Sequence, residues 1–478
     1  MSVIEAVDVN AGLQPADILA RQRQAFQRAG PPDLAERKDD VRKLRDAVKK
    51  EAEEIASVIS ADFGNRSRHE TLLADVWPVL TSARETLKHL AGWMKPKRVR
   101  VGLELLPGRA RILCQPVGAV GIISPWNYPI QLALLPLISA LAAGNRVMLK
   151  PSELTPRTSD FLADFLGRLF SEEKVATVLG GPEMGAAFSA LPFDHLFYTG
   201  STEVGRRVMR AAAENLTPVT LELGGKSPCI IGCDAVLPAA AESTVSGKLL
   251  NAGQTCIAPD YILVPEHVRD NFVGLILEAV NKFYPSLSAN PDYTSIINAR
   301  HYGRITQYIE EARQLGTRVL EINPAGEPLS PQERKIAPTI LIDPADDLAV
   351  MREEIFGPVL PVKSYGTLDE AIEYVNSRPR PLALYYFGQD KRDRDKVLER
   401  TTSGGASVNE TLMHVVVENL PFGGIGPSGM GSYHGEYGFQ TFSHRKGVFL
   451  QSRYNAARLL RPPYGKVADA MKRILLSR

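Results

Sequence analysis

Cys256 is the residue whose type and position best suit covalent chemistry. It lies in the run Asn-Ala-Gly-Gln-Thr-Cys-Ile-Ala-Pro at 251–259, between an expected helix and an apolar strand at 261–264. A thiol at such a junction, flanked by small residues and main-chain amides, can be accessible and partly converted to the nucleophilic thiolate. The alternative is a cysteine packed in the core, the more common place for a free cysteine. Taken alone, the motif leaves both interpretations open.

Glu222 is the candidate general base. It stands at the end of the apolar strand expected at 219–223 and before a Gly-Gly turn at 224–225. Burial at that place raises the pKa of a carboxylate and prepares it to take a proton. A structural ion pair with Lys226 explains the residue equally well.

Three further groups could hold a nucleotide. Lys150 ends a strand at 146–150, and with Glu153 it could bind the two hydroxyls of an adenosine ribose, although a solvated charge pair is as common. The segment 197–205, Phe-Tyr-Thr-Gly-Ser-Thr-Glu-Val-Gly, is typical of a strand, a turn and a helix start. Its amides, from Gly200 to Gly205, could face a pyrophosphate.

Two other patterns are rejected. The literal fingerprint Gly-Ile-Gly-Pro-Ser-Gly at 424–429 does not follow a strand, and Pro427 interrupts any helix after it, so it is not a Rossmann site. Cys229 and Cys233 have no second pair of metal ligands, and no His-Glu-x-x-His motif occurs. The sequence therefore predicts no metal site.

The elements around these residues alternate between strands and helices. Strands are expected at 117–123, 146–150, 175–179, 195–199 and 219–223, with helices at 130–143, 159–170 and 203–214 between them. This alternation predicts a doubly wound, mostly parallel sheet with its binding crevice at the carboxyl ends of the strands. The polar candidates fall at or just beyond those ends: Asn127, Lys150, Ser201 and Glu222.

The flanking regions extend this pattern. One amphipathic helix is expected at 32–61 and a second long helix at 69–94, with a possible irregularity at Pro78. Alternation at 98–106 and 109–116 around Pro107-Gly108 predicts a hairpin that projects and pairs with another strand, and 447–450 is expected to be a late strand. A second α/β unit begins near residue 225, with strands at 229–232, 261–264 and near 318, 339 and 359, and helices at 238–252, 268–283 and 368–376.

Length and composition limit the classes of protein to which this chain can belong. The chain has 478 residues, which indicates two or three domains, and its net charge is only +2. Nothing in that balance suggests a nucleic-acid or membrane-surface partner. Four cysteines form no disulfide framework and favour a reducing compartment, so cytoplasm is expected, and the first thirty residues do not resemble a signal peptide. The apolar stretch 130–143 contains Pro136 and is shorter than the roughly 20 residues of a membrane span, so it is expected to be a buried helix.

Several long motifs resemble, in order, those of the aldehyde dehydrogenase superfamily, and the likeness runs from about residue 30 to 450. They are Pro-Trp-Asn-Tyr-Pro at 125–129, Leu-Lys-Pro-Ser-Glu at 149–153, the turn at 200–205, Leu-Glu-Leu-Gly-Gly-Lys-Ser-Pro at 221–228, Gly-Gln-Thr-Cys at 253–256, Glu-Glu-Ile-Phe-Gly-Pro-Val at 353–359 and Pro-Phe-Gly-Gly at 421–424.

The resemblance implies a mechanism. Cys256 would attack the aldehyde carbon, the Asn127 amide and the Cys256 N–H would stabilise the oxyanion, and Glu222 would activate water to hydrolyse the thioester. It also implies NAD as the cofactor, because the Glu153 carboxylate would repel the 2'-phosphate of NADP. NADP stays possible, since some relatives with a glutamate at this position use it. Lys150 and Glu354 would hold the two riboses, Phe356 would pack near the nicotinamide ribose, and Ser201 would meet the pyrophosphate. The expected cofactor-binding set is completed by Trp126, Glu153, Gly200 and Gly205.

The likeness is greatest to the class 3 branch and, within it, to bacterial coniferyl aldehyde dehydrogenases. The class 3 markers lie at 216–225, 258–261 and 429–435, and the closer ones at 60–67, 290–298 and 463–466. An aromatic phenylpropenal such as coniferyl aldehyde is therefore the first expected substrate. The alternatives are a medium- or long-chain aliphatic aldehyde, a CoA-acylating enzyme, which Glu222 disfavours, and a catalytically silent protein of the same fold.

The family likeness also predicts the domains. Residues 1–97 and 117–224, with 418–440 returning to them, are expected to bind the coenzyme, and 225–417 to form the catalytic domain. Residues 98–116 and 441–478 are expected to form an oligomerisation arm and a C-terminal tail, in a homodimer. The charges in 468–478 disfavour a membrane anchor, and this tail could be a small amphipathic helix over the substrate tunnel.

Overall fold

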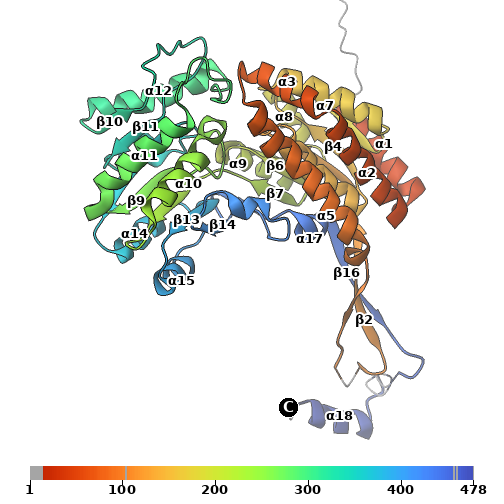
Figure 1. Cartoon of the computed structure of the whole chain (residues 1–478). Coiled ribbons are helices and arrows are strands. Elements are labelled where there is room, and N and C mark those ends of the chain that lie inside the picture. The colour runs from red at the N-terminus through yellow and green to blue at the C-terminus, as the bar shows by residue number, and fades with distance from the viewer. Residues whose placement is uncertain (1–13, 103–104, 456–457, 459–460, 477–478) are drawn as a thin grey trace, which may run out of the picture.

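A computed structural model describes residues 14–102, 105–455, 458 and 461–476. Two sheets form two lobes side by side, and a three-stranded arm projects from them (Figure 1). The first lobe contains a six-stranded sheet that is parallel apart from its edge strand β15. Its strands, in spatial order, are β15 (Gly429–Met430), β7 (Val219–Glu222), β6 (His195–Thr199), β3 (Ala119–Ile123), β4 (Arg146–Lys150) and β5 (Val175–Thr177).

Helices cover this sheet. The expected buried helix is α6 (Gln131–Ala143), and twelve of its thirteen residues are buried, which explains why its sequence is apolar on every face. The others that follow a strand of the sheet are α7 (Pro156–Leu169), α8 (Pro182–Ser189) and α9 (Thr202–Ala213). Apart from α8, which was not predicted, the alternation read from the sequence is confirmed here.

The N-terminal helices differ in detail from the prediction. The single helix expected at 32–61 is wrong: α2 (Leu34–Lys50) and α3 (Ala52–Phe63) are separate, because Glu51 leaves the helical conformation (φ −101°, ψ 18°). The helix expected at 69–94 is irregular as predicted, but before Pro78. It consists of α4 (Arg68–Thr71), a wider π-helical turn η1 (Leu72–Val76) and α5 (Trp77–Trp93). A further helix, α1 (Pro15–Ala29), was not predicted.

The second lobe contains a seven-stranded sheet, parallel except for its edge strand β10. Its strands, in spatial order, are β10 (Arg318–Glu321), β11 (Thr339–Ile342), β12 (Val359–Tyr365), β9 (Tyr261–Pro265), β8 (Pro228–Ile231), β13 (Ala383–Phe387) and β14 (Gly405–Val408). Helices that pack around it are α10 (Leu237–Leu249), α11 (Arg269–Phe283), α12 (Ala299–Gln314), α14 (Leu368–Asn376) and α15 (Lys391–Arg400). Of these elements, α12, α15, β13 and β14 were not predicted.

The arm consists of β1 (Lys97–Val99), β2 (Arg109–Pro116) and β16 (Ser443–Leu450). As predicted, the ribbon pairs with a later strand, since β16 runs antiparallel along the whole of β2. The prediction of a tight hairpin turn at Pro107-Gly108 is wrong. Pairing of β1 with β2 ends at Val99 and Ala110, because Gly108 N–H donates to the Leu105 carbonyl and closes a separate turn (2.8 Å).

The C-terminal tail does form a helix, α18 (Lys466–Leu476), as expected. Figure 1 shows it beyond the far end of the arm, away from both lobes. The expected place over a tunnel of the same chain is therefore wrong. A search of the described helices found none with both the length and the apolar character needed to cross a membrane.

Candidate active site

The three predicted catalytic side chains come from a strand end and two loops where the two sheets face each other. Asn127 follows β3, and Glu222 is the last residue of β7. Cys256 comes after α10 and a short 3-10 turn, η3 (Leu250–Gly253), and before β9. Because β3 and β7 are parallel strands of one sheet, their carboxyl ends open on the same edge, where the second lobe presents the cysteine.

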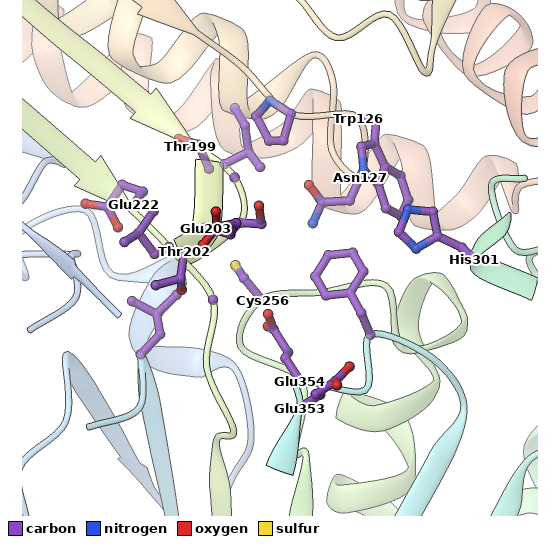
Figure 2. Close-up of a pocket in the computed structure, with 18 of the residues that line it drawn as sticks. Trp126, Asn127, Thr199, Thr202, Glu203, Glu222, Cys256, His301, Glu353 and Glu354 are labelled. Atoms are coloured by element: carbon purple, nitrogen blue, oxygen red, sulfur yellow. The ribbon is translucent and has the colours of Figure 1, made fainter. Parts of the chain in front are cut away.

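Cys256 lies where two cavities meet. A cavity of about 480 Å³ is lined by residues of both lobes, and Figure 2 shows its side chains around the sulfur. A second cavity, of about 280 Å³, is mostly apolar. Four residues line both of them: Leu132, Cys256, Phe422 and Tyr433. The cysteine is therefore not sealed in the core, and the packed-cysteine alternative is wrong.

The expected activation of this thiol is also wrong for the protein chain alone. Burial, followed by the negative charges of Glu354 and Glu222, raises the pKa of the Cys256 thiol to about 12. The main-chain N–H groups of Cys256 and Ile257 act in the opposite direction but are outweighed. At neutral pH the sulfur carries its proton, so nucleophilic attack requires a base in the cavity.

Glu222 has the environment that a base needs. It is 3% exposed, and neither carboxylate oxygen has a hydrogen-bond partner among the described residues. Burial raises the pKa of Glu222 well above its usual value. Lys226 does not pair with it. The Lys226 ammonium forms an ion pair with Asp260 and donates to the carbonyls of Val350 (2.8 Å) and Glu353 (2.9 Å). The alternative that Glu222 forms a structural ion pair with Lys226 is therefore wrong.

Asn127 is held with its amide beside the nucleophile. It is 3% exposed, and its Nδ2 donates to the main-chain carbonyl of Gln254 (3.1 Å). An amide nitrogen carries two protons, so one remains for a ligand. Figure 2 shows the Asn127 amide facing the sulfur, with Glu222 on the opposite side of Cys256 in that view.

Glu354 occupies the same cavity. Burial, and after it the negative charge of Asp260, raises the pKa of Glu354 to about 8, and its Oε1 is buried without a partner among the described residues. Arg304 fixes the loop by donating to the carbonyls of Glu354 (3.2 Å) and Ile355 (2.9 Å). A β-carbon on Gly224 would lie 2.0 Å from Glu354 Oε2, so glycine at this position leaves the space that the carboxylate occupies.

An aromatic group forms one wall of this cavity. The Trp126 ring packs edge-on to Phe356 at 5.4 Å and against His301 at 5.3 Å between ring centroids. Phe356 has a left-handed backbone (φ 49°), which is unusual for a bulky residue. Burial, with nearby Arg304 and Arg300, lowers the pKa of His301 to about 4, so this ring is neutral at physiological pH.

The remaining cofactor candidates divide into two groups. Gly200 and Ser201 line the larger cavity, and the Ser201 hydroxyl caps α9 by accepting from Val204 N–H (3.4 Å). Lys150, Glu153 and Gly205 are not among its lining residues. Lys150 Nζ lies 3.4 Å from Glu153 Oε2 at the end of β4. A β-carbon on Gly205 would meet Leu223 at 2.6 Å, so this glycine lets α9 pack closely on the sheet.

Sequence reasoning missed part of this site. His301 and Arg304 come from α12, a helix that was not predicted. The helical spacing of Ile305, Ile309 and Ala312 was a signal that could have predicted this helix. Phe422 and Tyr433 lie within two of the family motifs, at 421–424 and 429–435, but those motifs did not indicate a place beside Cys256. Their main chains exchange two hydrogen bonds (3.0 and 2.8 Å), and this pairing across a glycine-rich loop places both rings beside Cys256.

A comparison with family models matches residues 8–448 to the aldehyde dehydrogenase family. The chain belongs to this family. The resemblance inferred from the motifs is thereby confirmed, and it covers nearly all of the two lobes and most of the arm.

Curated relatives narrow the position within the family. A "probable coniferyl aldehyde dehydrogenase" of Caulobacter vibrioides is 52% identical over 456 residues, which is 94% of each chain. "Aldehyde dehydrogenase family 3 member A2" of Pongo abelii is 41% identical over 93% of this chain and 90% of its own. The similarity to the class 3 branch and to coniferyl aldehyde dehydrogenases is thus confirmed.

Solved structures of other proteins have the same fold as this chain. A substrate-bound Staphylococcus aureus AldH superposes with a TM-score of 0.92 at 38% identity, covering 97% of this chain and all of the other. PnpE in complex with nicotinamide adenine dinucleotide has a TM-score of 0.83 at 25% identity, covering 92% and 90% of the chains. The expected class, a doubly wound α/β lobe with a second α/β lobe and a small β arm, is confirmed.

Proposed function

We propose that this protein oxidises an aldehyde to its carboxylic acid, with NAD as the oxidant and Cys256 as the nucleophile. The observation that carries the proposal is the position of Cys256 at the meeting point of two cavities, one lined by Asn127, Glu222 and Glu354 among others and one lined mostly by apolar side chains. An oxidation through a covalent intermediate needs this arrangement, because the carbon held by sulfur must face both the oxidant and its own apolar side chain.

The larger cavity suits the nicotinamide half of a dinucleotide. Glu354 has a buried carboxylate oxygen to which no residue in the described part of the chain donates, which fits an acceptor for ribose hydroxyls. The N-terminus of α9, which begins after the cap residue Ser201, lines this cavity and supplies main-chain amides for the pyrophosphate. The Gly200 N–H is already donated to the Glu222 carbonyl (3.0 Å), so Gly200 would contribute by letting the turn approach the phosphates closely. Lys150 and Glu153 would hold the adenosine ribose, and Trp126, Phe356 and Gly205 complete the proposed binding set. When bound, NAD supplies an acceptor for the hydride that leaves the substrate carbon.

The chain's own residues account for the other steps. Glu222 takes the proton of Cys256, whose sulfur then bonds to the carbonyl carbon, and the carbonyl oxygen gains the negative charge. Asn127 Nδ2 and the Cys256 N–H stabilise that oxyanion, and each such donor contributes about 3 to 4 kcal/mol. After the hydride has left, the carbon is a thioester. Glu222 releases the first proton to solvent and can act as a base again. It then takes a proton from water as the water oxygen bonds to the thioester carbon. The C–S bond breaks to release the acid, and the Cys256 sulfur takes its proton back from Glu222.

We propose an aromatic phenylpropenal such as coniferyl aldehyde as the substrate. The name of the Caulobacter relative supports this choice. So does the smaller cavity: its apolar walls include Trp77, Leu132 and Leu135, while Thr81 and Gln131 add uncharged polar groups that suit ring substituents. A medium- or long-chain aliphatic aldehyde is the second candidate, favoured by the exposed Leu73 and Met413 on the walls of this cavity.

Steady-state rates with coniferaldehyde, benzaldehyde and decanal separate these substrates. Coniferaldehyde should show the highest kcat/KM, and a clear preference for decanal would instead select the aliphatic class. Acyl-CoA appearing in place of free acid when CoA is added would show the acylating reaction.

Further assignments extend the proposal. We propose that the six-stranded lobe binds the coenzyme, that the seven-stranded lobe presents the nucleophile, and that the arm joins two copies in a homodimer. A cytoplasmic location fits the four free cysteines. NAD is preferred to NADP because the Glu153 carboxylate would repel a 2'-phosphate.

Cys256→Ala tests the assignment directly. The variant should lose NADH production with every aldehyde while its Kd for NAD stays near that of the wild type. Substantial turnover by the variant would reject the proposed nucleophile. A wild-type protein that binds NAD but oxidises none of the three aldehydes would support the catalytically silent alternative.

A further inference from the structure

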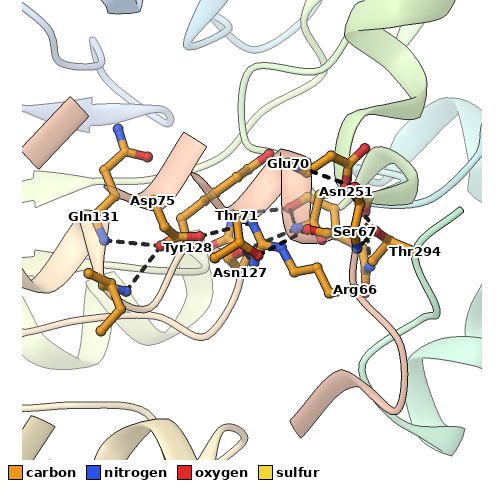
Figure 3. Close-up of polar contacts among 12 residues, drawn as sticks. Arg66, Ser67, Glu70, Thr71, Asp75, Asn127, Tyr128, Gln131, Asn251 and Thr294 are labelled. Atoms are coloured by element: carbon orange, nitrogen blue, oxygen red, sulfur yellow. Dashed lines mark hydrogen bonds and ion pairs between the residues drawn. The ribbon is translucent and has the colours of Figure 1, made fainter. Parts of the chain in front are cut away.

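A buried ion pair lies behind the loop that carries Asn127. Arg66 Nη2 is 3.0 Å from Asp75 Oδ2, and both side chains are fully buried. Asp75 Oδ1 also accepts from the main-chain N–H groups of Ile130 (3.1 Å) and Gln131 (3.0 Å), where α6 begins. Figure 3 shows this connection, which anchors the C-terminal side of the Asn127 loop to η1.

A second nitrogen of the same guanidinium reaches Asn127 itself. Arg66 Nη1 donates to the main-chain carbonyl of Asn127 (2.7 Å), and Asn251 Nδ2 donates to that carbonyl from the nucleophile side (3.1 Å). A carbonyl oxygen has two lone pairs, so these two donors saturate it. The main chain of Asn127 is therefore held from both sides.

The side chain of Asn127 is tied to the Cys256 turn by a third contact. The carbonyl of Gln254 accepts from Asn127 Nδ2 and from Asn251 Nδ2, each at 3.1 Å. The turn before the cysteine is strained, since Asn251 (φ 54°) and Ala252 (φ 50°) both have left-handed backbones. Such a conformation persists only where surrounding contacts enforce it.

We propose that Arg66 and Asn251 are positioning residues for the oxyanion site and that they act through the main-chain carbonyl of Asn127. This inference rests on the function proposed above. The two arms of the guanidinium let Arg66 serve a carboxylate and a carbonyl together, which a single ammonium does not reproduce. If the Asn127 loop shifts, the amide no longer meets the developing oxyanion, and a misplacement of about 1 Å can cost about 100-fold in rate.

Arg66→Lys is the first test because it keeps a positive charge beside Asp75. We expect kcat for aldehyde oxidation to fall about 10- to 100-fold with KM little changed. The rate at which iodoacetamide alkylates Cys256 should stay within about twofold, because that displacement develops no oxyanion. The Kd for NAD should also be unchanged. A parallel fall in alkylation would overturn the proposal, since it would show general loosening of the site.

A double-mutant cycle asks whether Arg66 acts through Asn127. In an Asn127→Ala background, adding Arg66→Lys should lower kcat by less than about threefold, since the amide it positions is already absent. The same proportional loss in both backgrounds would overturn the proposal.

Asn251→Gly provides a second route if Arg66→Lys does not fold. Glycine accepts the left-handed backbone at this position, so the substitution removes the Asn251 Nδ2 hydrogen bonds to the carbonyls of Asn127 and Gln254 without adding strain. We expect the same pattern, with reduced kcat and unchanged alkylation. Full kcat in Asn251→Gly, with an active wild type, would reject this inference alone, whereas a wild type without aldehyde oxidation would reject the proposed function as well.

Discussion

Asn127 Nδ2 donates to the main-chain carbonyl of Gln254 at 3.1 Å, two residues before Cys256. Asn127 belongs to the lobe of the six-stranded sheet, and Gln254 to the loop that leads into β9 of the other. One hydrogen bond thus joins the proposed oxyanion donor to the turn that carries the proposed nucleophile. The two groups that must act on one carbonyl are fixed relative to each other across the junction of the lobes.

Glu222→Gln should separate the two halves of the reaction. Without this base the thiol attacks more slowly and the thioester that forms is not hydrolysed, so NADH should rise slowly to about one per active site and then stall. Acid quenching should trap the acyl group on Cys256. A slow linear rate that continues past one NADH per active site would show that Glu222 serves only as the base for the thiol.

Glu354→Gln should make the thiol more reactive in the absence of cofactor. Above the Glu354 pKa of about 8, the Glu354 charge contributes to the high pKa of Cys256, so its removal lowers that pKa and raises the thiolate fraction at pH 9, about tenfold for each unit. Alkylation by iodoacetamide should therefore accelerate while the affinity for NAD falls, because a ribose acceptor is lost. Unchanged alkylation would show that the Glu354 charge does not reach the sulfur.

Glu153→Gln should relax the preference for NAD. Its carboxylate, 3.4 Å from Lys150 Nζ, is partly exposed, so the repulsion of a 2'-phosphate is screened by salt. We expect kcat/KM for NADP to rise at least about fivefold at low ionic strength, with a smaller gain in high salt. An equal gain with NAD would mean that the substitution acts on something other than the phosphate.

Glu70→Gln should change how stability depends on pH. Burial raises the pKa of Glu70 from 4.5 to about 7, against the opposing charge of Arg66 and its hydrogen bonds to Thr294 and Asn251. The folded protein therefore binds the Glu70 proton more tightly than the unfolded chain does. The stabilisation is complete below about pH 4.5 and is lost as pH rises through about 7, amounting to about 3 kcal/mol.

Urea unfolding at several pH values checks this sign. Between pH 4.5 and 7 the free energy of unfolding of the wild type should fall relative to that of Glu70→Gln. Glu53→Gln is the control, since Glu53 is exposed and paired with Arg68, which lowers its pKa and reverses the sign. Parallel curves for the wild type and Glu70→Gln would contradict the prediction.

The fold was largely predictable where local sequence and tertiary environment agree. The apolar run 130–143 could only be a buried helix, and strands such as β3 and β4 are short, apolar and bounded by turns. The misses have local causes. The helix break at Glu51 contains no glycine or proline from which it could be predicted. The turn formed by Leu105 and Gly108 replaces the strand pairing that the alternation of residues predicts there. The helix α12 was not predicted, although Ile305, Ile309 and Ala312 have helical spacing.

The sequence by itself determined which chemical groups are available: a thiol in a turn, a carboxylate at the end of an apolar strand and an amide beside a tryptophan, in the order typical of one family. Only the tertiary structure decided their states, because a pKa depends on burial and neighbouring charge, and both come from segments far apart in the chain. The sequence suggested an activated thiol and a possible Glu222–Lys226 pair. The fold instead gives Cys256 a pKa of about 12, pairs Lys226 with Asp260, and leaves Glu222 buried and unpaired among the described residues.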